Sequence, residues 1–193
     1  LNLCQLLSVL YTITVNVNIN NDKPVASGGS FSTNEDTILS KILPASDPNG
    51  DAITSYTVVT NPSQGNVSII SNVFNYTPNT NYNGTDSFTY KVNDGTDDSP
   101  AGTINITVNP INNAPTFTST GITSVNEDST YTYNITTNDA DTGNTITITA
   151  PTKPAWLTIT DNNNGTATLT GTPTNSDVGI HNVKLRVNDG TVN

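Results

Sequence analysis

Short runs of alternating hydrophobic and polar residues recur along the chain, separated by turns rich in Asn, Asp, Gly and Pro. Alternation with a period of two predicts strands with one buried face, and no run has a helical period. Short strands at this spacing are typical of antiparallel β-sandwiches of immunoglobulin-like type. The predicted fold class is therefore all-β, with strands expected at 51–58, 67–70, 72–76, 86–92, 102–108, 130–135, 145–148, 167–170 and 183–187.

The chain contains an internal repeat of about 92 to 95 residues. Asn-Glu-Asp occurs at 34–36 and 126–128, and Val-Asn-Asp-Gly occurs at 92–95 and 187–190. The repeat predicts two tandem immunoglobulin/cadherin-like sandwiches, domain 1 at 20–111 and domain 2 at 112–193, preceded by an N-terminal strand at 1–19.

The two copies of the repeat differ at their ends. The first copy continues after its Asn-Asp-Gly through the alternating segment 102–108, whereas the second reaches Asn193 without such a segment. The phrase Ile-Thr-Val-Asn of that segment, at 106–109, also occurs at 13–16, ahead of both domains. We therefore expect domain 2 to lack its last strand, and the N-terminal segment to carry a matching one.

The N-terminal segment is the longest alternating run, with hydrophobic side chains on one face of residues 1–19, interrupted only by Gln5. At about 3.3 Å per residue it would extend about 60 Å, far beyond a usual strand. An unpaired edge of this length is an aggregation hazard, so we expect it to add to an open sheet. The side chains expected to be buried by strand donation are Leu7, Val9, Tyr11, Ile13, Val15 and Val17.

Two interpretations explain the extra N-terminal strand and the strand that domain 2 is expected to lack. In the first, the N-terminal strand of one subunit completes domain 2 of the next, and this head-to-tail contact between copies builds a fibre because it does not close. In the second, the 193 residues are a stretch of a longer array, whose domains are stable alone and stay monomeric.

Composition limits the classes of partner. There are 16 acidic and 6 basic side chains, which give a formal net charge of −10. Because binding to phosphates needs clustered Lys and Arg, we predict that the chain does not bind nucleic acid. The single cysteine permits no internal disulfide. No apolar stretch approaches the length of a transmembrane helix, so no membrane insertion is expected.

Several motifs resemble a known family. The stretches 34–37, 47–51, 83–90 and 111–115 resemble the bacterial cadherin-like tandem repeats of large surface adhesins. The second copy, through 154–157 and 169–173, is similar to the dystroglycan-type cadherin-like variant or a related immunoglobulin-like variant. The resemblance covers nearly everything after Asn20, and it implies an extracellular or cell-surface protein with a structural or adhesive role.

The resemblance also implies calcium at the seams between consecutive domains, because calcium takes six to eight oxygen ligands from such loops. For the seam between the two domains, the ligands carried over by motif are Glu35, Asp86, Asn112, Asn113, Asp139, Asp141 and Asp189. For a seam with a preceding module, they are Asp22, Asp47, Asp51 and Asp94, with Glu127 and Asp177 on that module.

The calcium set departs from the family pattern. Asn112 and Asn113 stand where an Asp is usual, and Asn49 occupies the position in the first copy that is equivalent to Asp141 in the second. Fewer anionic ligands predict weaker binding of calcium. The alternative is that these Asx-rich loops are only turns, since Asx side chains bond their own backbone.

Catalysis has little support. His181 is the only histidine, expected to face solvent, and the carboxylates come with no aromatic cleft, so we predict that the chain is not an enzyme. We expect Trp156 to pack into a sandwich core. A carbohydrate-binding module, with Trp156 exposed, is another alternative, and contacts with glycans or cell surfaces remain open.

Overall fold

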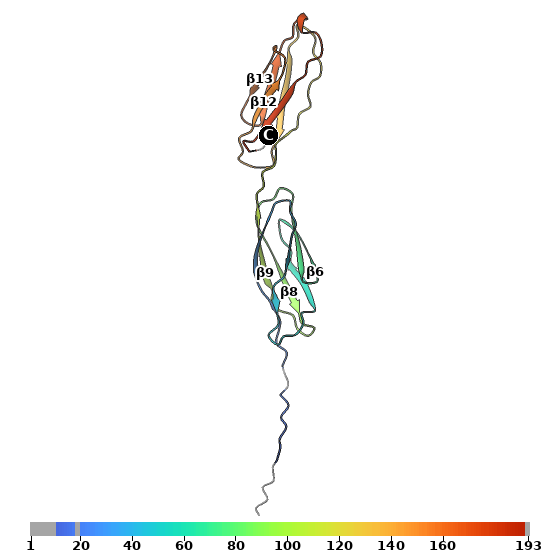
Figure 1. Ribbon diagram of the computed structural model, residues 1–193, viewed down its shortest axis with the longest axis vertical. Helices are drawn as coiled ribbons and strands as arrows, with labels where there is room; N and C mark the ends of the chain where they lie inside the picture. Colours follow the sequence, from blue (N-terminus) through green and yellow to red (C-terminus); the bar gives the residue numbers. More distant parts are fainter. Residues whose placement is uncertain (1–10, 18–19, 192–193) are drawn as a thin grey trace, which may run out of the picture. The chain divides into compact units, whose positions relative to one another are not determined.

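The computed structural model describes residues 11–17 and 20–191. These residues form β-strands and one turn of 3₁₀ helix, arranged as two immunoglobulin-like units (Figure 1). The predicted all-β class with two tandem sandwiches is confirmed. No helix in the described part of the chain is long and apolar enough to span a membrane.

Sandwich 1 contains a four-stranded sheet, a three-stranded sheet and a short two-stranded pair. The strand orders are β2-β9-β8-β5, β3-β7-β6 and β1-β4. The strands are β1 (Val25–Ala26), β2 (Gly29–Asn34), β3 (Leu39–Ile42), β4 (Ala45–Ser46), β5 (Ser55–Thr60), β6 (Gly65–Ile70), β7 (Val73–Pro78), β8 (Gly84–Asn93) and β9 (Gly102–Asn109).

The core of sandwich 1 follows from alternation along β7, β8 and β9. Every second residue of β9 is buried, and Ile104, Ile106 and Val108 are at most 2% exposed. Phe74 of β7 packs edge-to-face on Phe88 of β8, with ring centroids 5.2 Å apart. Strand β9 therefore fills the sheet and supplies a central row of the core.

Sandwich 2 contains a four-stranded sheet with the order β10-β11-β14-β13 and a second sheet of only two strands, β12-β15. A 3₁₀ turn, η1 (Asn175–Asp177), precedes β15. The strands are β10 (Thr116–Phe117), β11 (Tyr131–Asn138), β12 (Thr147–Thr152), β13 (Leu157–Asp161), β14 (Thr166–Gly171) and β15 (Lys184–Asn188).

The core of sandwich 2 is smaller. Its fully packed members include Ile135 of β11, Ile148 of β12, Leu169 of β14 and Val187 of β15. Strand β12 pairs with β15 as β5 pairs with β8 in sandwich 1, since Ile148 lies opposite Val187 and Tyr56 lies opposite Val92.

The sequence pattern missed several strands. Strand β2 reads Gly-Ser-Phe-Ser-Thr-Asn, which carries little hydrophobic alternation, and it neighbours β9 in the four-stranded sheet. Its extended conformation is therefore stabilised by pairing rather than by its own residues. Strand β13 was also missed, although Leu157 and Ile159 alternate with threonine along it, and β14 lies beside it along its whole length.

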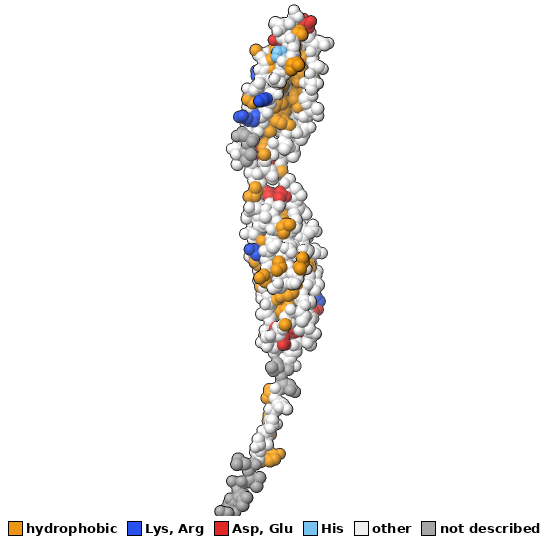
Figure 2. Space-filling view, turned by 45° about the vertical axis from the view of Figure 1, so that its right-hand side comes forward, with side chains coloured by type: hydrophobic (Ala, Val, Ile, Leu, Met, Phe, Trp, Pro, Cys, Tyr) orange, Lys and Arg blue, Asp and Glu red, His pale blue; other side chains and the backbone are white. Residues whose placement is uncertain are grey.

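The N-terminal segment is not a strand where the structure describes it. Residues 11–17 have no strand assignment, and Tyr11, Ile13, Val15 and Val17 are 85%, 71%, 74% and 87% exposed. The predicted strand is absent there because a strand needs a hydrogen-bonded neighbour, and no described residue provides one. Its other expected anchors, Leu7 and Val9, lie outside the described residues. Figure 2 shows hydrophobic side chains exposed on the chain ahead of sandwich 1.

The core of sandwich 1 gives a direct stability test. Replacing Phe74, which is fully buried between Phe31 and Phe88, by alanine should lower the free energy of unfolding by about 3 to 5 kcal/mol. Ile70→Ala is the control, because Ile70 is 68% exposed and should change stability by less than about 0.5 kcal/mol. Urea denaturation measures both; equal losses would contradict the assigned core.

Candidate functional site

Sandwich 2 has an open groove of about 1080 Å³. One wall is the irregular segment 121–127, and the other is formed by Val183 and Leu185. Leu157 and Leu169 lie among the residues that form its floor. Figure 2 shows hydrophobic side chains in a stripe along this sandwich, with the histidine beside it.

In sandwich 1, strand β9 occupies the space between the segments that are equivalent to the two walls of this groove. It lies between β2 and β8 in the four-stranded sheet. By the internal repeat, segment 121–126 of sandwich 2 corresponds to β2, and β15 corresponds to the end of β8. The groove therefore occupies the position of a closing strand.

No described residue fills that position. Strand β15 has β12 as its one strand neighbour among the described residues. Segment 121–126 has no strand assignment, whereas β2 is a regular strand. A strand needs a hydrogen-bonded neighbour, so the irregular course of segment 121–126 is consistent with having no strand beside it among the described residues.

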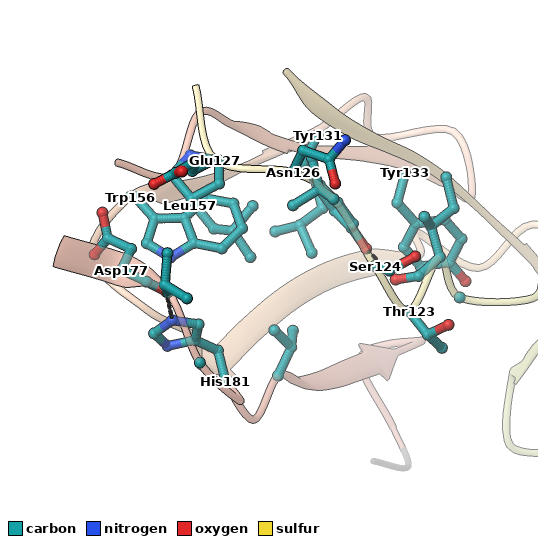
Figure 3. A pocket seen from close by; sticks show the side chains of 18 of the residues that line it. Thr123, Ser124, Asn126, Glu127, Tyr131, Tyr133, Trp156, Leu157, Asp177 and His181 are labelled. Atoms are coloured by element: carbon teal, nitrogen blue, oxygen red, sulfur yellow. Dashed lines mark hydrogen bonds between the residues drawn. The ribbon is translucent and has the colours of Figure 1, made fainter. Parts of the chain in front are cut away.

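The two ends of the groove differ in chemistry (Figure 3). At one end the Trp156 ring packs edge-to-face on His181, with centroids 5.9 Å apart, and the His181 Nε2 lies 2.6 Å from the carbonyl oxygen of Asp177. At the other end, the hydroxyls of Tyr133 and Ser119 are 2.8 Å apart. Trp156 Nε1 is buried and has no hydrogen-bond partner in the described structure.

Both expectations about these aromatic residues are confirmed. Trp156 is half-buried and packs against the core of sandwich 2, and His181 is exposed.

The two acidic residues predicted for a preceding module lie beside this groove. Asp177 caps the η1 turn, accepting hydrogen bonds from the Thr174 amide and hydroxyl at 2.9 and 2.8 Å, and these bonds lower its carboxyl pKa. Glu127 is exposed. Its counterpart Glu35 is buried instead.

Glu35 is buried because β9 is present beside it. Its backbone amide donates to the Asn109 carbonyl at 2.9 Å, and its Oε1 accepts a hydrogen bond from the Ile111 amide. The residue is only 4% exposed, and Oε2 has no hydrogen-bond partner in the described structure. A buried carboxylate oxygen without a donor is costly, which makes Glu35 a candidate cation ligand.

Four residues predicted for the seam gather with the linker at one end of sandwich 2. Asn112 Nδ2 donates to Asp189 Oδ2 at 2.7 Å, and the Asn113 amide donates to Asp141 Oδ2 at 2.6 Å. Asp189 is only 5% exposed although it carries a carboxyl group. The linker is therefore fastened to this end by Asx side chains.

Asp139 belongs to the same cluster. Its Oδ1 accepts from the Asp141 amide at 2.9 Å, and its Oδ2 accepts from Asn144 Nδ2 at 3.4 Å. Asn144 also approaches Asn112 Oδ1, at 3.5 Å. Asn144 was not among the ligands predicted from the sequence, because it lies beyond the acidic motif, next to Gly143.

Sandwich 1 binds its own leading linker in the same way. Asn21 Nδ2 donates to Asp94 Oδ2 at 3.1 Å, and the Asp22 amide donates to Asn49 Oδ1 at 2.6 Å. Hydrogen bonds from the Asp97 and Thr96 amides lower the pKa of Asp94. These contacts match those of Asn112 with Asp189 and of Asn113 with Asp141.

The other predicted residues of this end also have assigned positions. Asp47 Oδ1 accepts from the amides of Asn49 and Asp51, at 2.8 and 3.2 Å, as a turn-forming Asx residue does. Asp47 Oδ2 is buried and has no partner in the described structure. Asp51 itself is exposed.

Asp86 has a structural role in sandwich 1. Its carboxylate accepts hydrogen bonds from the Ser63, Gln64 and Ser87 amides at 2.9 to 3.0 Å and from the Tyr76 hydroxyl at 2.9 Å. Burial raises the carboxyl pKa, but the hydrogen bonds outweigh burial and the pKa lies below its ordinary value. Since donors surround both oxygens, this arrangement favours a loop clamp over a cation ligand.

The predicted ligands do not form a compact metal centre. Among the residues that the structure describes, no three His, Cys, Asp or Glu side chains gather closely enough to hold a metal ion. The loop clusters are rich in Asp and Asn oxygens, which suits calcium in chemical type, but amide N–H groups face several of the carboxylates.

Comparison with known families divides the chain into two matched parts. Residues 21–107 match the family described as "Bacterial Ig domain", and residues 114–193 match the one described as "Putative Ig domain". A curated relative, "Integrin beta-like protein B" of Dictyostelium discoideum, is 34% identical over 111 residues. That match covers 49% of this chain and 6% of the relative.

Solved structures with the same fold include cadherin ectodomains. Extracellular cadherin domains 3–6 of protocadherin gamma B2 align over 85% of this chain and 42% of that chain, with a TM-score of 0.59 and 15% identity. The protocadherin gamma B4 extracellular domain aligns over 92% and 31%, with a TM-score of 0.54 and 16% identity. A variant of an endo-fucoidan hydrolase from glycoside hydrolase family 107 aligns over 95% of this chain and 29% of that chain at 24% identity, with a TM-score of 0.42.

The clamp around Asp86 predicts a pH-dependent contribution to stability. Asp86→Asn should lower the free energy of unfolding at pH 7 by about 1 to 3 kcal/mol, because donors around the carboxylate lose their acceptor. A lowered folded pKa means that this contribution is complete above the ordinary value of 3.8 and is lost as pH falls through the folded pKa. Urea denaturation should therefore show a difference that narrows at acid pH.

Asp51→Asn, measured in chelator, is the control for this experiment, because Asp51 is exposed. It should change stability by less than about 0.5 kcal/mol. A difference between wild type and Asp86→Asn that stays constant from pH 7 to pH 2 would contradict the clamp.

Proposed function

Since the chain is a tandem of bacterial Ig/cadherin-like domains, we propose that it is a non-catalytic, extracellular structural or adhesive protein. Copies of it join head to tail, with the N-terminal strand of one copy, residues 1–19, completing sandwich 2 of the next. The groove of sandwich 2 is the observation that carries this proposal.

Two exposed apolar surfaces of matching kind support strand donation. The groove is lined by Phe117, Ile122 and Val183, which are 38%, 49% and 37% exposed, and the N-terminal segment exposes a hydrophobic row at 11–17. A strand added to an open sheet gains main-chain hydrogen bonds, while its alternate side chains fill the groove. Because donor and acceptor lie on different parts of the chain, the contact is heterologous and propagates.

A second candidate is that the chain is one stretch of a longer surface adhesin. The match to a relative of which it covers only 6% favours this alternative. The groove would then be closed by residues that follow in the same polypeptide. The two proposals differ in the oligomeric state of the 193-residue chain.

The acidic surface and the fold support an extracellular role. A net charge of −10 repels nucleic acid and anionic membranes. The described clusters of charged residues lie in loops around linkers, where they hold the chain in position. Contacts with glycans or cell surfaces belong to the adhesive part of the proposal.

Calcium at the linkers is the second part of the proposal. Asn112 and Asn144 direct amide N–H groups at carboxylates, and rotating each amide would present its oxygen instead. With Asp139, Asp141, Asp189 and Asn113 this gives an oxygen-rich ligand set, and Glu35 is bonded to the residue before Asn112. Neutralising these carboxylates would stiffen the linker. The equivalent set on sandwich 1 is Asp22, Asp47, Asp51 and Asp94.

Strand donation predicts that removing residues 1–19 abolishes assembly. The intact chain should form filaments or concentration-dependent oligomers by negative-stain electron microscopy and light scattering, whereas the truncated chain should be monomeric. The control replaces exposed Val59 of β5 by Ser, because it also removes surface hydrophobicity but lies far from the groove in sequence. Filaments that persist after truncation would end the proposal.

Calcium binding predicts a ligand-dependent melting temperature. Calcium in 100-fold excess over Kd should stabilise the folded state by about 2.7 kcal/mol relative to chelator, and thus raise Tm by several degrees. Asp141→Asn should reduce this increase. Asp98→Asn should not, because Asp98 pairs with Lys91 at 2.5 Å outside the ligand set. A Tm that chelator leaves unchanged would refute the calcium sites.

A further inference from the structure

The repeat within the chain specifies how the groove is filled. Resting on the proposed strand donation, we infer that residues 11–16 of a second copy lie parallel to segment 121–126, with Asn16 beside Asn126. Tyr11 enters the groove opposite Gly121. This assigns the occupant, its direction and its register.

The direction follows from β2 and β9. A Cβ added to Gly28 would lie 3.2 Å from the Thr103 carbonyl oxygen, and the Glu35 amide donates to the Asn109 carbonyl oxygen at 2.9 Å. Residue numbers therefore rise together along the two strands, which run parallel. The donated segment runs in the same direction along 121–126.

The register comes from the last pair of β2 and β9. Asn109 Nδ2 lies 3.4 Å from Asn34 Oδ1, so these residues are neighbours across the two strands. Asn34 corresponds to Asn126, and Asn109 corresponds to Asn16 through the shared phrase Ile-Thr-Val-Asn. Asn16 of the donor is thereby placed beside Asn126.

This register places the exposed hydrophobic row inside the groove. Ile104, Ile106 and Val108 of β9 are buried, and their counterparts are Tyr11, Ile13 and Val15. The intervening residues are polar, and they face solvent in β9. A register shift of one residue would turn every side chain of the donated strand to the opposite face. Polar side chains would then lie in the groove and hydrophobic ones in water.

The sizes of the side chains fit the same register. In sandwich 1, Phe31 of β2 reaches the core and packs edge-to-face on Phe74, with centroids 5.5 Å apart. Its counterpart in sandwich 2 is the small Thr123, whereas the donor carries Tyr11 where β9 has Ile104. The larger donor side chain compensates for the smaller wall residue.

Gly121 leaves room for that tyrosine. A Cβ added to its counterpart Gly29 would lie 3.3 Å from Ile104 Cδ1, so the two positions are adjacent in sandwich 1. A Cβ added to Gly121 would meet no atom within 4 Å. The groove is therefore open at the position where the register places Tyr11.

Disulfide cross-linking tests the register in the full chain. In a Cys4→Ser background, Asn16→Cys with Asn126→Cys should form an intermolecular disulfide, because paired strands lie about 4.8 Å apart and disulfides span about 4.4 to 6.8 Å between Cα atoms. Thr12→Cys with Asn126→Cys is the matched control, offset by four residues or about 13 Å. Non-reducing gel electrophoresis should show dimers and longer species for the first pair and monomer for the second.

Gly121→Leu tests the groove independently. Gly121 is exposed and has space around it, so the leucine should leave Tm unchanged while it blocks Tyr11 and abolishes filaments. Thr120→Leu, one residue earlier and therefore on the outward face, should leave filaments intact.

The outcomes separate this inference from the function on which it rests. Filaments without the 16–126 disulfide, or filaments formed by Gly121→Leu, would overturn the register and leave strand donation standing. A cross-linked species that migrates as a monomer would contain an intramolecular disulfide. It would contradict the inference that a second copy fills the groove. Absence of both filaments and cross-links in the intact chain would overturn the proposed function as well.

Discussion

An incomplete β-sheet is the constraint on which the properties of this protein depend. Backbone amides and carbonyls must be paired, and a sandwich core must be covered on both sides. In sandwich 1, β9 meets both requirements, supplying Ile104, Ile106 and Val108 to the core. In sandwich 2 no described residue occupies the equivalent place, and a groove of about 1080 Å³ remains.

The open position beside segment 121–126 among the described residues has consequences beyond the groove. Segment 121–126 loses the strand conformation of its counterpart β2, although the Asn-Glu-Asp motif that follows is the same. Glu127 is exposed where Glu35 is buried, since no described residue lies beside Glu127 as Asn109 and Ile111 lie beside Glu35. The two segments thus differ in structure although they share Gly, Ser and Asn at equivalent positions and are followed by the same Glu-Asp pair.

The linkers show the opposite behaviour, since the same contacts form twice. Asn21 binds Asp94 as Asn112 binds Asp189, and the amides of Asp22 and Asn113 find equivalent acceptors in Asn49 and Asp141. Short Asx side chains close to the backbone suit this task, because they bridge loop and linker at little entropic cost. Equivalent Asx side chains therefore hold both linkers to the sandwiches that follow them.

The sequence by itself determined the all-β class, the two-domain repeat and the strands with clear alternation. In a strand such as β9, hydrophobic and polar residues alternate along the sequence just as buried and exposed residues alternate in the structure. Its phrase at 106–109, repeated at 13–16, also indicated that the N-terminal segment has the pattern of β9. Only the tertiary structure decided the conformation and the contacts of residues whose partners are distant in sequence. Strand β2 exists because of β9, Asp86 is a loop clamp because Ser63, Gln64 and Tyr76 converge on it, and Asn144 joins the linker cluster through folding. Local sequence cannot encode such contacts, since Ser63 and Asp86 are 23 residues apart and Asn112 and Asn144 are 32 residues apart.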